Sequence, residues 1–198
     1  MSSPFNSFRA SNSLRRQPSA RATTANISAL AGRDSTVDAN ATLGIIKIGD
    51  ATTSSHSWAL KSTGGAVITL DNISANSQIN QTATSFGDGI TVPLALNGSL
   101  DITNLAAAKP LTISGGITSS AAIGIQTISN LGTAAGGLII SGVIGDNPTP
   151  STGIIAITQN NAAGALTLAG ANTYTGVTTI VAGTLQAANA TALGSGGD

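Results

Sequence analysis

The only histidine, His56, is the first residue at which chemistry could be centred. It lies in the segment Ser54-Ser55-His56-Ser57-Trp58, beside the only tryptophan. A Ser-His-Asp triad needs a well-placed histidine base, and zinc sites draw on several His or Cys ligands. One histidine and no cysteine exclude a multi-histidine or thiolate metal site. Two interpretations of the pair remain: a spot where a ligand stacks on Trp58, or an exposed loop that tucks Trp58 against the end of the fold. We favour the second.

The acidic residues could act on polysaccharides, because glycoside hydrolases need two carboxyl groups roughly 5 to 9 Å apart. A lyase would need a carboxylate cluster holding Ca²⁺ together with a basic residue. All eight acids are aspartates scattered singly, at Asp34, Asp38, Asp50, Asp71, Asp88, Asp101, Asp146 and Asp198. Asp50 and Asp71 could stack on neighbouring rungs of a repeat, with Lys47 or Lys61 nearby. An aspartate after a strand is more often a turn former, so we predict no catalytic residue and no enzyme.

Glycine-rich segments are candidates for binding Ca²⁺ or phosphate. Calcium-binding nonapeptides repeat Gly-Gly-x-Gly-x-Asp, whereas this chain has only the isolated segments Gly87-Asp88-Gly89 and Gly196-Gly197-Asp198. No glycine-rich loop carries the lysine of a phosphate-binding loop. We therefore predict neither a metal site nor a cofactor.

The basic residues concentrate at the start of the chain. Residues 1–33 hold no acid and five arginines, Arg9, Arg15, Arg16, Arg21 and Arg33. No aromatic residue is interleaved between these arginines, so we do not predict nucleic-acid binding. Residues 1–40 are instead predicted to form a disordered basic leader. They contain no apolar run typical of a secretion signal, and the chain has no run of about 18 apolar residues that would predict a transmembrane helix.

The composition favours an all-β fold. Apolar residues make up 41% of the 198-residue chain, but only 3% are aromatic and 8% charged, against about 25% charged in a typical domain. Thr, Ile, Val, Ser, Asn and Gly dominate, and they favour strands and tight turns. With no cysteine, stability must come from packing and backbone hydrogen bonds.

A short phrase recurs: apolar, any residue, apolar, any residue, then Gly or Asx. It includes Leu111-Thr112-Ile113-Ser114-Gly115, Leu138-Ile139-Ile140-Ser141-Gly142 and Leu166-Thr167-Leu168-Ala169-Gly170. Alternation places both apolar side chains on one face of a strand, and the Gly or Asn that follows permits a positive φ and a sharp corner. Short strands and corners at this spacing predict a right-handed parallel β-helix over residues 41–198. An antiparallel sandwich, with a hairpin at Asn97-Gly98, is the alternative.

Residues 164–197, GALTLAGANTYTGVTTIVAGTLQAANATALGSGG, resemble the autotransporter-associated β-strand repeat of bacterial passenger domains. The run Asn172-Thr173-Tyr174-Thr175-Gly176 is the most specific part of the resemblance. Val177 departs from the family, which usually has a second glycine there, and Asn161 to Ala163 replace the usual Lys and Gly. The resemblance implies a parallel β-helix displayed outside the cell as part of a much longer chain.

The function expected from these features is that of a structural stalk or passenger segment on the bacterial outer surface or in the medium, without catalysis. Its partners would be neighbouring segments of a longer chain, because the sequence stops just after the segment Leu193 to Gly197 without a polar cap and is fragment-like. The alternatives are an adhesin that binds carbohydrate or a cell surface, and a polysaccharide-acting β-helix enzyme.

Overall fold

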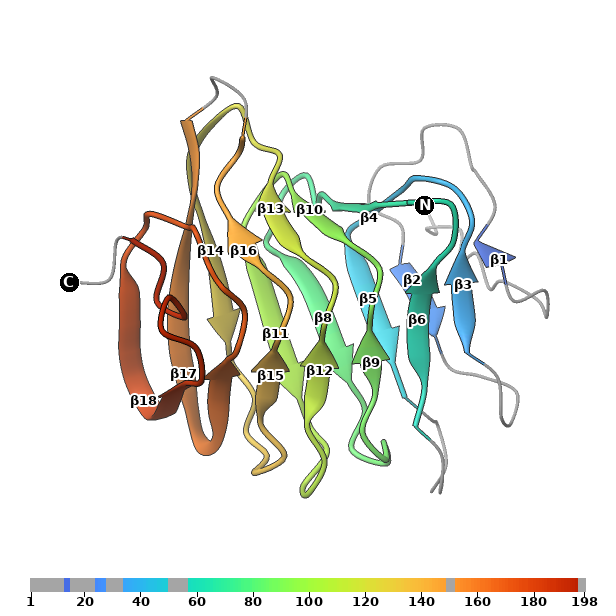
Figure 1. Cartoon of the computed structure of the whole chain (residues 1–198). Helices are drawn as coiled ribbons and strands as arrows, with labels where there is room; N and C mark the ends of the chain where they lie inside the picture. The colour runs from blue at the N-terminus through green and yellow to red at the C-terminus, as the bar shows by residue number, and fades with distance from the viewer. Residues whose placement is uncertain (1–12, 15–23, 28–33, 50–56, 149–151, 196–198) are drawn as a thin grey trace.

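The computed structural model describes residues 13–14, 24–27, 34–49, 57–148 and 152–195, and this part of the chain contains strands and no helix. Successive strands wind into stacked rungs with three faces (Figure 1). The first face contains β2 (Thr24–Ile27), β5 (Ile45–Ile48), β8 (Ser77–Gln81), β11 (Leu100–Asn104) and β14 (Ile123–Asn130). The second contains β1 (Ser13–Leu14), β3 (Ser35–Val37), β6 (Ala59–Ser62), β9 (Gly89–Ile90), β12 (Leu111–Ile113) and β15 (Leu138–Ile140). The third contains β4 (Ala41–Leu43), β7 (Ile68–Leu70), β10 (Leu94–Leu96), β13 (Ile117–Ser119) and β16 (Ile144–Gly145).

Two longer strands form the C-terminal end of the stack. The bent strand β17 (Thr152–Leu168) pairs with β14 on the first face and with β15 on the second, so it joins both faces in one sheet. Strand β18 (Thr178–Ala187) pairs with β17 and forms the last rung.

Each of these pairings between strands is parallel, which confirms the predicted β-solenoid. Leu111 lies opposite Leu138, and Leu138 lies opposite Leu166, so the recurring phrase marks one turn of the solenoid. The antiparallel sandwich is wrong: Asn97-Gly98 is no hairpin but connects β10 on the third face to β11 on the first.

The core forms because alternate residues of each strand face inward. Strands β7, β10, β12 and β15 each bury their two outer apolar residues and leave the middle residue partly exposed. Stacking repeats the same side chain from rung to rung, as in the column Ile68, Leu94, Ile117 and Ile144. Each rung buries its apolar face only against its neighbours, which is the physical basis of solenoid stability.

The glycines that follow the recurring phrase have a different role from the one predicted. Gly115, Gly142 and Gly170 do not have positive φ, whereas Gly49, which follows the copy of the phrase in β5 on the first face, has a φ of 114°. A Cβ on Gly142 would clash with the carbonyl oxygen of Gly115, and one on Gly170 would clash with that of Gly142. These corners therefore need glycine because successive rungs approach too closely for any side chain.

The ladder extends upstream of residue 41. Strand β3 pairs with β6, and Val37 is fully buried in the core. Most of the segment predicted to be a disordered leader, including its five arginines, lies outside the described residues. None of the described segments forms a helix that could cross a membrane.

Candidate functional site

The best-defined cluster of interacting side chains lies at the C-terminal repeat, where Asn172 ties three successive rungs together. Its side-chain oxygen accepts a hydrogen bond from the Ile144 N–H of the preceding rung at 2.9 Å. Its side-chain NH₂ donates to the Ala192 carbonyl at 2.6 Å, in the segment that follows β18. Asn172 is buried, so both bonds form away from water and fix the vertical spacing of the rungs.

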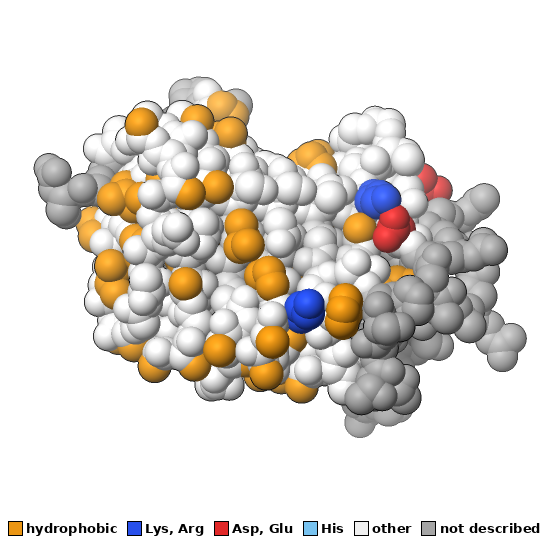
Figure 2. All heavy atoms as spheres, turned by 60° about the horizontal axis from the view of Figure 1, so that its bottom comes forward, with side chains coloured by type: hydrophobic (Ala, Val, Ile, Leu, Met, Phe, Trp, Pro, Cys, Tyr) orange, Lys and Arg blue, Asp and Glu red, His pale blue; other side chains and the backbone are white. Residues whose placement is uncertain are grey.

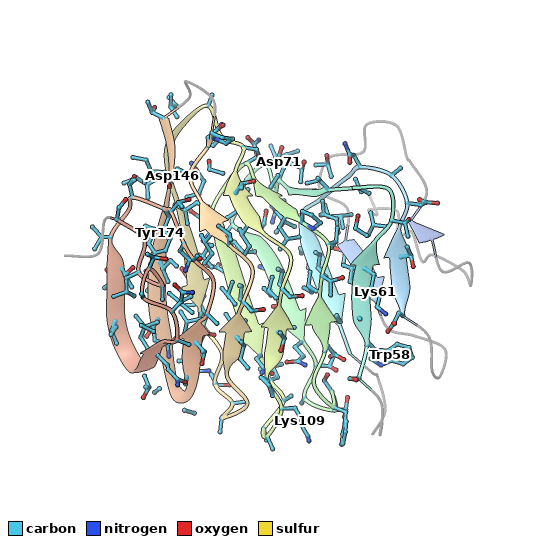
Figure 3. The ribbon with its side chains drawn as sticks, in the orientation of Figure 1. Trp58, Lys61, Asp71, Lys109, Asp146 and Tyr174 are labelled. Carbon is cyan, nitrogen blue, oxygen red and sulfur yellow. The ribbon has the colours of Figure 1, made fainter. Side chains whose placement is uncertain are left out.

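Tyr174 fills the interior at the same end of the solenoid (Figure 3). Its ring is fully buried, and its hydroxyl lies 2.7 Å from the Thr178 hydroxyl. Burial raises the pKa of the Tyr174 hydroxyl, and the hydrogen bond with Thr178 partly opposes that rise. A buried tyrosine ring therefore fills the core at this end of the solenoid.

Asp146 links the repeat to the preceding rung. One carboxylate oxygen accepts from the Ile155 N–H at 2.7 Å, and the other accepts from the Thr175 N–H at 3.0 Å and the Thr175 hydroxyl at 2.6 Å. The next residue, Gly176, passes so close to the Ile155 carbonyl that a Cβ could not fit. Each role in this run belongs to one residue. Asn172 bridges the rungs, Tyr174 fills the core, Thr175 bonds to Asp146, and Gly176 allows the chain to pass close to the Ile155 carbonyl.

The two departures from the repeat pattern are accommodated at exposed or capped positions. The Val177 side chain is exposed, while its carbonyl still accepts from the Ile157 N–H at 3.0 Å. Asn161 is buried, and its side-chain oxygen accepts from the N–H groups of Ala163 and Gly164. Asn161 therefore caps the bend within β17.

The last rung has one open side. Ile180 lies in register with Gln159, which is fully buried, yet Ile180 itself is 55% exposed. Leu185 lies opposite Leu166 and is only partly buried. Strand β18 pairs with β17 alone among the described strands. Its outer edge therefore presents free backbone groups and inward-facing apolar side chains, as an interior rung would before the next one is added.

Comparison with protein families identifies this end of the chain. Residues 163–187 match the passenger-associated-transport-repeat, which confirms the resemblance found in the sequence. No curated protein and no solved structure matches the chain. The described part of the chain is therefore a parallel β-solenoid whose C-terminal end matches this repeat.

The described residues considered for polysaccharide chemistry lie on three different faces. Asp71 follows β7 on the third face, where the Asn97 side chain donates to it at 3.2 Å, while Lys47 lies on the first face and Lys61 on the second. Asp50 lies outside the described residues, but the strand before it, β5, belongs to a different sheet from β7. Within the described part of the chain, no three His, Cys, Asp or Glu side chains form a group that could hold a metal. The absence of catalysis remains a prediction.

The sequence singled out His56 and Trp58 as a pair just before β6. His56 lies outside the described residues, so only Trp58 has a described position. Trp58 is only 3% exposed and packs with the hydrophobic core. Its backbone N–H donates to the buried Asp88 at 2.8 Å. This burial agrees with the loop interpretation and argues against a flat, exposed stacking platform.

Sequence reasoning missed a set of buried amides at the corner between the first and second faces. These residues share an inward position at the end of a first-face strand: Gln81, Asn104, Asn130 and Gln159. Asn130 donates to Gln159 of the next rung at 2.7 Å. The available signal was an Asn or Gln two residues beyond an inward Ile, in Ile79-Asn80-Gln81, Ile102-Thr103-Asn104, Ile128-Ser129-Asn130 and Ile157-Thr158-Gln159.

Proposed function

We propose that this chain is a structural segment of an autotransporter-like passenger, in which stacked rungs build a stalk displayed outside the cell. The observation that carries the proposal is the open last rung, with Ile180 exposed in a column whose preceding member is buried. Exposed apolar surface of this kind marks an interaction site. The repeat at residues 163–187 is of a type found in exported passengers.

The chemistry of the open end favours another parallel rung as its partner. A rung that continued the pattern would place Ile or Leu over Ile180 and Leu185 and would pair with the free edge of β18. Solenoid ends normally need a cap to stay soluble. The remaining surface has few charges and many hydroxyl and amide groups, which suits a spacer that makes no strong electrostatic contact.

Location tests the passenger part of the proposal. Producer cells would be fractionated and blotted with antibody raised against residues 41–198, with and without protease added to intact cells. We expect a band much larger than 19.3 kDa in the outer-surface or culture fraction, and loss of that band on protease treatment. A protease-resistant cytoplasmic band at 19.3 kDa would contradict display outside the cell.

Extension tests the stacking part. A second copy of residues 164–195, appended after Ser195, should raise the midpoint of thermal unfolding, because it covers Ile180 and pairs with β18. The matched control carries asparagine at the appended positions that correspond to Leu166 and Leu168. Equal midpoints for both extended chains would show that the open rung does not accept another by apolar stacking.

A further inference from the structure

A shallow groove lies on the second face, at the level of β6, β9 and β12. Its volume is about 410 Å³, within the range of small-molecule sites. Figure 2 shows that charged side chains are sparse on this side of the molecule and that a basic side chain stands beside apolar ones. The groove is lined by Asp34, Ser57, Trp58, Ala59, Phe86, Gly87, Asp88, Gly89, Lys109, Pro110 and Thr112.

The floor of the groove is flat because small side chains face outward in register. Ala59 lies opposite Gly89, and Gly89 lies opposite Thr112. A Cβ on Gly89 would make only loose contacts, 3.9 Å from the Trp58 carbonyl oxygen and 4.0 Å from the Ala59 Cβ. Strand β9 is paired on both sides, with β6 and β12. A peptide therefore cannot add here as an extra strand, and a ligand must be recognised by side chains.

The acids that line the groove are already committed within the protein. Asp34 pairs with Lys61 and accepts from the Ala59 N–H at 3.2 Å. Asp88 is 2% exposed, and its oxygens accept from the Trp58 N–H, the Gln81 side chain and the Ser85 hydroxyl. Neither carboxylate needs a ligand cation.

Lys109 is the cation that remains for a ligand among the lining residues. Its ammonium lies 4.2 Å from the centre of the Phe86 ring, an attraction that holds the charge at the groove. Phe86 is itself 47% exposed and offers apolar area beside the ammonium. Figure 3 places Lys109 and Trp58 at the same lower edge of the solenoid.

Two hydroxyl groups line the groove beside this charge. Ser57 is exposed and Thr112 is partly exposed, and both side chains can donate hydrogen bonds. The indole Nε1–H of Trp58 has no partner among the described residues, but it is buried and is not among the groups that a ligand can reach. The groove therefore presents hydrogen-bond donors and one positive charge, next to an apolar ring.

We propose that this groove binds an acidic saccharide, a pyranose unit that carries a carboxylate. The carboxylate pairs with Lys109, the C–H face of the ring lies against Phe86 and Pro110, and ring or carboxylate oxygens accept from the Ser57 and Thr112 hydroxyls. This binding role is separate from the structural role of the open C-terminal rung, which lies at the other end of the solenoid.

The test is calorimetric titration of the purified chain with three trisaccharides: trigalacturonate, a sialylated trisaccharide and an uncharged galactose trisaccharide. We expect the chain to bind at least one acidic trisaccharide at least 10-fold more tightly than the uncharged one. Trigalacturonate and the sialylated sugar distinguish the two sources of a sugar carboxylate. A pentaglutamate peptide is the fourth ligand, because a site that recognises only charge would bind it equally well.

Two variants and two matched controls locate the binding. Lys109→Gln removes the charge, and Gly89→Leu fills the floor from a position whose φ suits any residue. Each should weaken binding of the acidic sugar at least 10-fold. Lys47→Gln removes the same charge on the first face, and Thr118→Leu adds similar bulk on the third face; both should leave affinity unchanged. Failure of both acidic sugars to bind, equal binding of the uncharged sugar or of pentaglutamate, or full affinity in Lys109→Gln and Gly89→Leu would each overturn the proposal.

Discussion

Two of the three corners of each rung differ in the length of the connection and in the side chain that precedes it. Between the second and third faces, the chain turns within three residues at most rungs, such as 114–116 after β12, where the inward side chains on both sides are aliphatic; the connection after β6, residues 63–67, is longer. Between the first and second faces, the connections are longer, such as 105–110 after β11, and the last inward residue of β8, β11 and β14 is an amide. The strand before the longer corner thus ends in an inward Asn or Gln at β8, β11 and β14, whereas β5 ends in the buried Ile48.

The reason is the hydrogen bonding of the backbone. A three-residue corner directs its N–H groups into the ladder, as when the Ser114 and Gly115 N–H groups donate to Ile90. A longer corner leaves buried carbonyl and N–H groups inside the bend. The Asn104 side chain donates to the carbonyls of Lys109 and Gly137, and accepts from the Ala106 N–H. Buried backbone groups must be satisfied, so the amide is part of the corner rather than of the core.

The largest effect should come from placing an amide where the corner does not need one. Leu138 is buried between Leu111 and Leu166. Leu138→Asn removes the buried side chain and leaves an amide without partners, so we expect a loss of about 5 kcal/mol in the free energy of unfolding. Urea denaturation followed by circular dichroism measures the loss. Leu138→Met, which conserves volume, should cost less than about 1.5 kcal/mol, and a loss below that value for Leu138→Asn would contradict the contrast.

The reverse exchange should also destabilise, although it makes the interior more apolar. Asn104→Leu leaves the Lys109 and Gly137 carbonyls and the Ala106 N–H without their partner. We expect a loss of about 3 kcal/mol, because each unsatisfied buried group costs roughly 1 kcal/mol or more and the added apolar burial offsets part of it. The matched control is Thr103→Val on the outward side of the same strand, expected within about 0.5 kcal/mol of the parent. Unchanged or increased stability of Asn104→Leu would refute the capping role.

The tight corner should be sensitive to a single methyl group. Gly142→Ala forces a Cβ against the Gly115 carbonyl oxygen, so the two rungs must move apart; we expect a loss of about 2 kcal/mol. Gly98→Ala is the control, because a Cβ there meets no atom within 4 Å and its φ is not positive. That change should be neutral or stabilise by up to about 1 kcal/mol. Similar values for both variants would mean that the close approach of rungs does not limit the tight corner.

The sequence predicted only part of the difference between the two corners. The recurring phrase predicted the aliphatic columns, because alternation fixes which side chains face inward, and it predicted the parallel stacking through its spacing. The role of Gly142 was not readable, since a glycine needed for rung contact and one needed for positive φ look alike in a sequence. The amides were missed for a related reason: Asn104 and Gln159 resemble ordinary turn residues until their backbone partners, which are far apart in the chain, are brought together by the fold.

The groove was harder still to anticipate. Trp58 and Lys109 are far apart in the sequence, and only the stacking of β6, β9 and β12 places them along one surface. Phe86 and Asp88 lie in a segment where the glycine pattern drew attention to Ca²⁺, whereas Asp88 proved to hold the start of β6 through the Trp58 N–H. Sequence alone identifies which residues are unusual here but not which of them meet.

The smallest predicted effect on stability concerns Tyr174, whose ring lies in the apolar core and whose hydroxyl is bonded to Thr178. Its pKa is raised in the folded state by burial, so the unfolded chain ionises first as the pH rises. The stabilising contribution is complete below about pH 10, the ordinary tyrosine value, and declines above it by at most roughly 1.4 kcal/mol per pH unit. Because the chain has one tyrosine, absorbance at 295 nm reports this titration directly, and the folded protein should titrate above pH 10.

Tyr174→Phe tests the contribution of the hydroxyl separately from that of the ring. It keeps the ring in the core and removes the bond to Thr178, so we expect a loss of about 1 kcal/mol at neutral pH. It should also flatten the decline of stability above pH 10, because it removes the hydroxyl whose pKa burial raises. If the parent and Tyr174→Phe lose stability in parallel between pH 10 and 11, then the ring is not shielded from water. In that case water would reach the core at the last rung, unlike at the stacked Ile and Leu side chains of the earlier rungs.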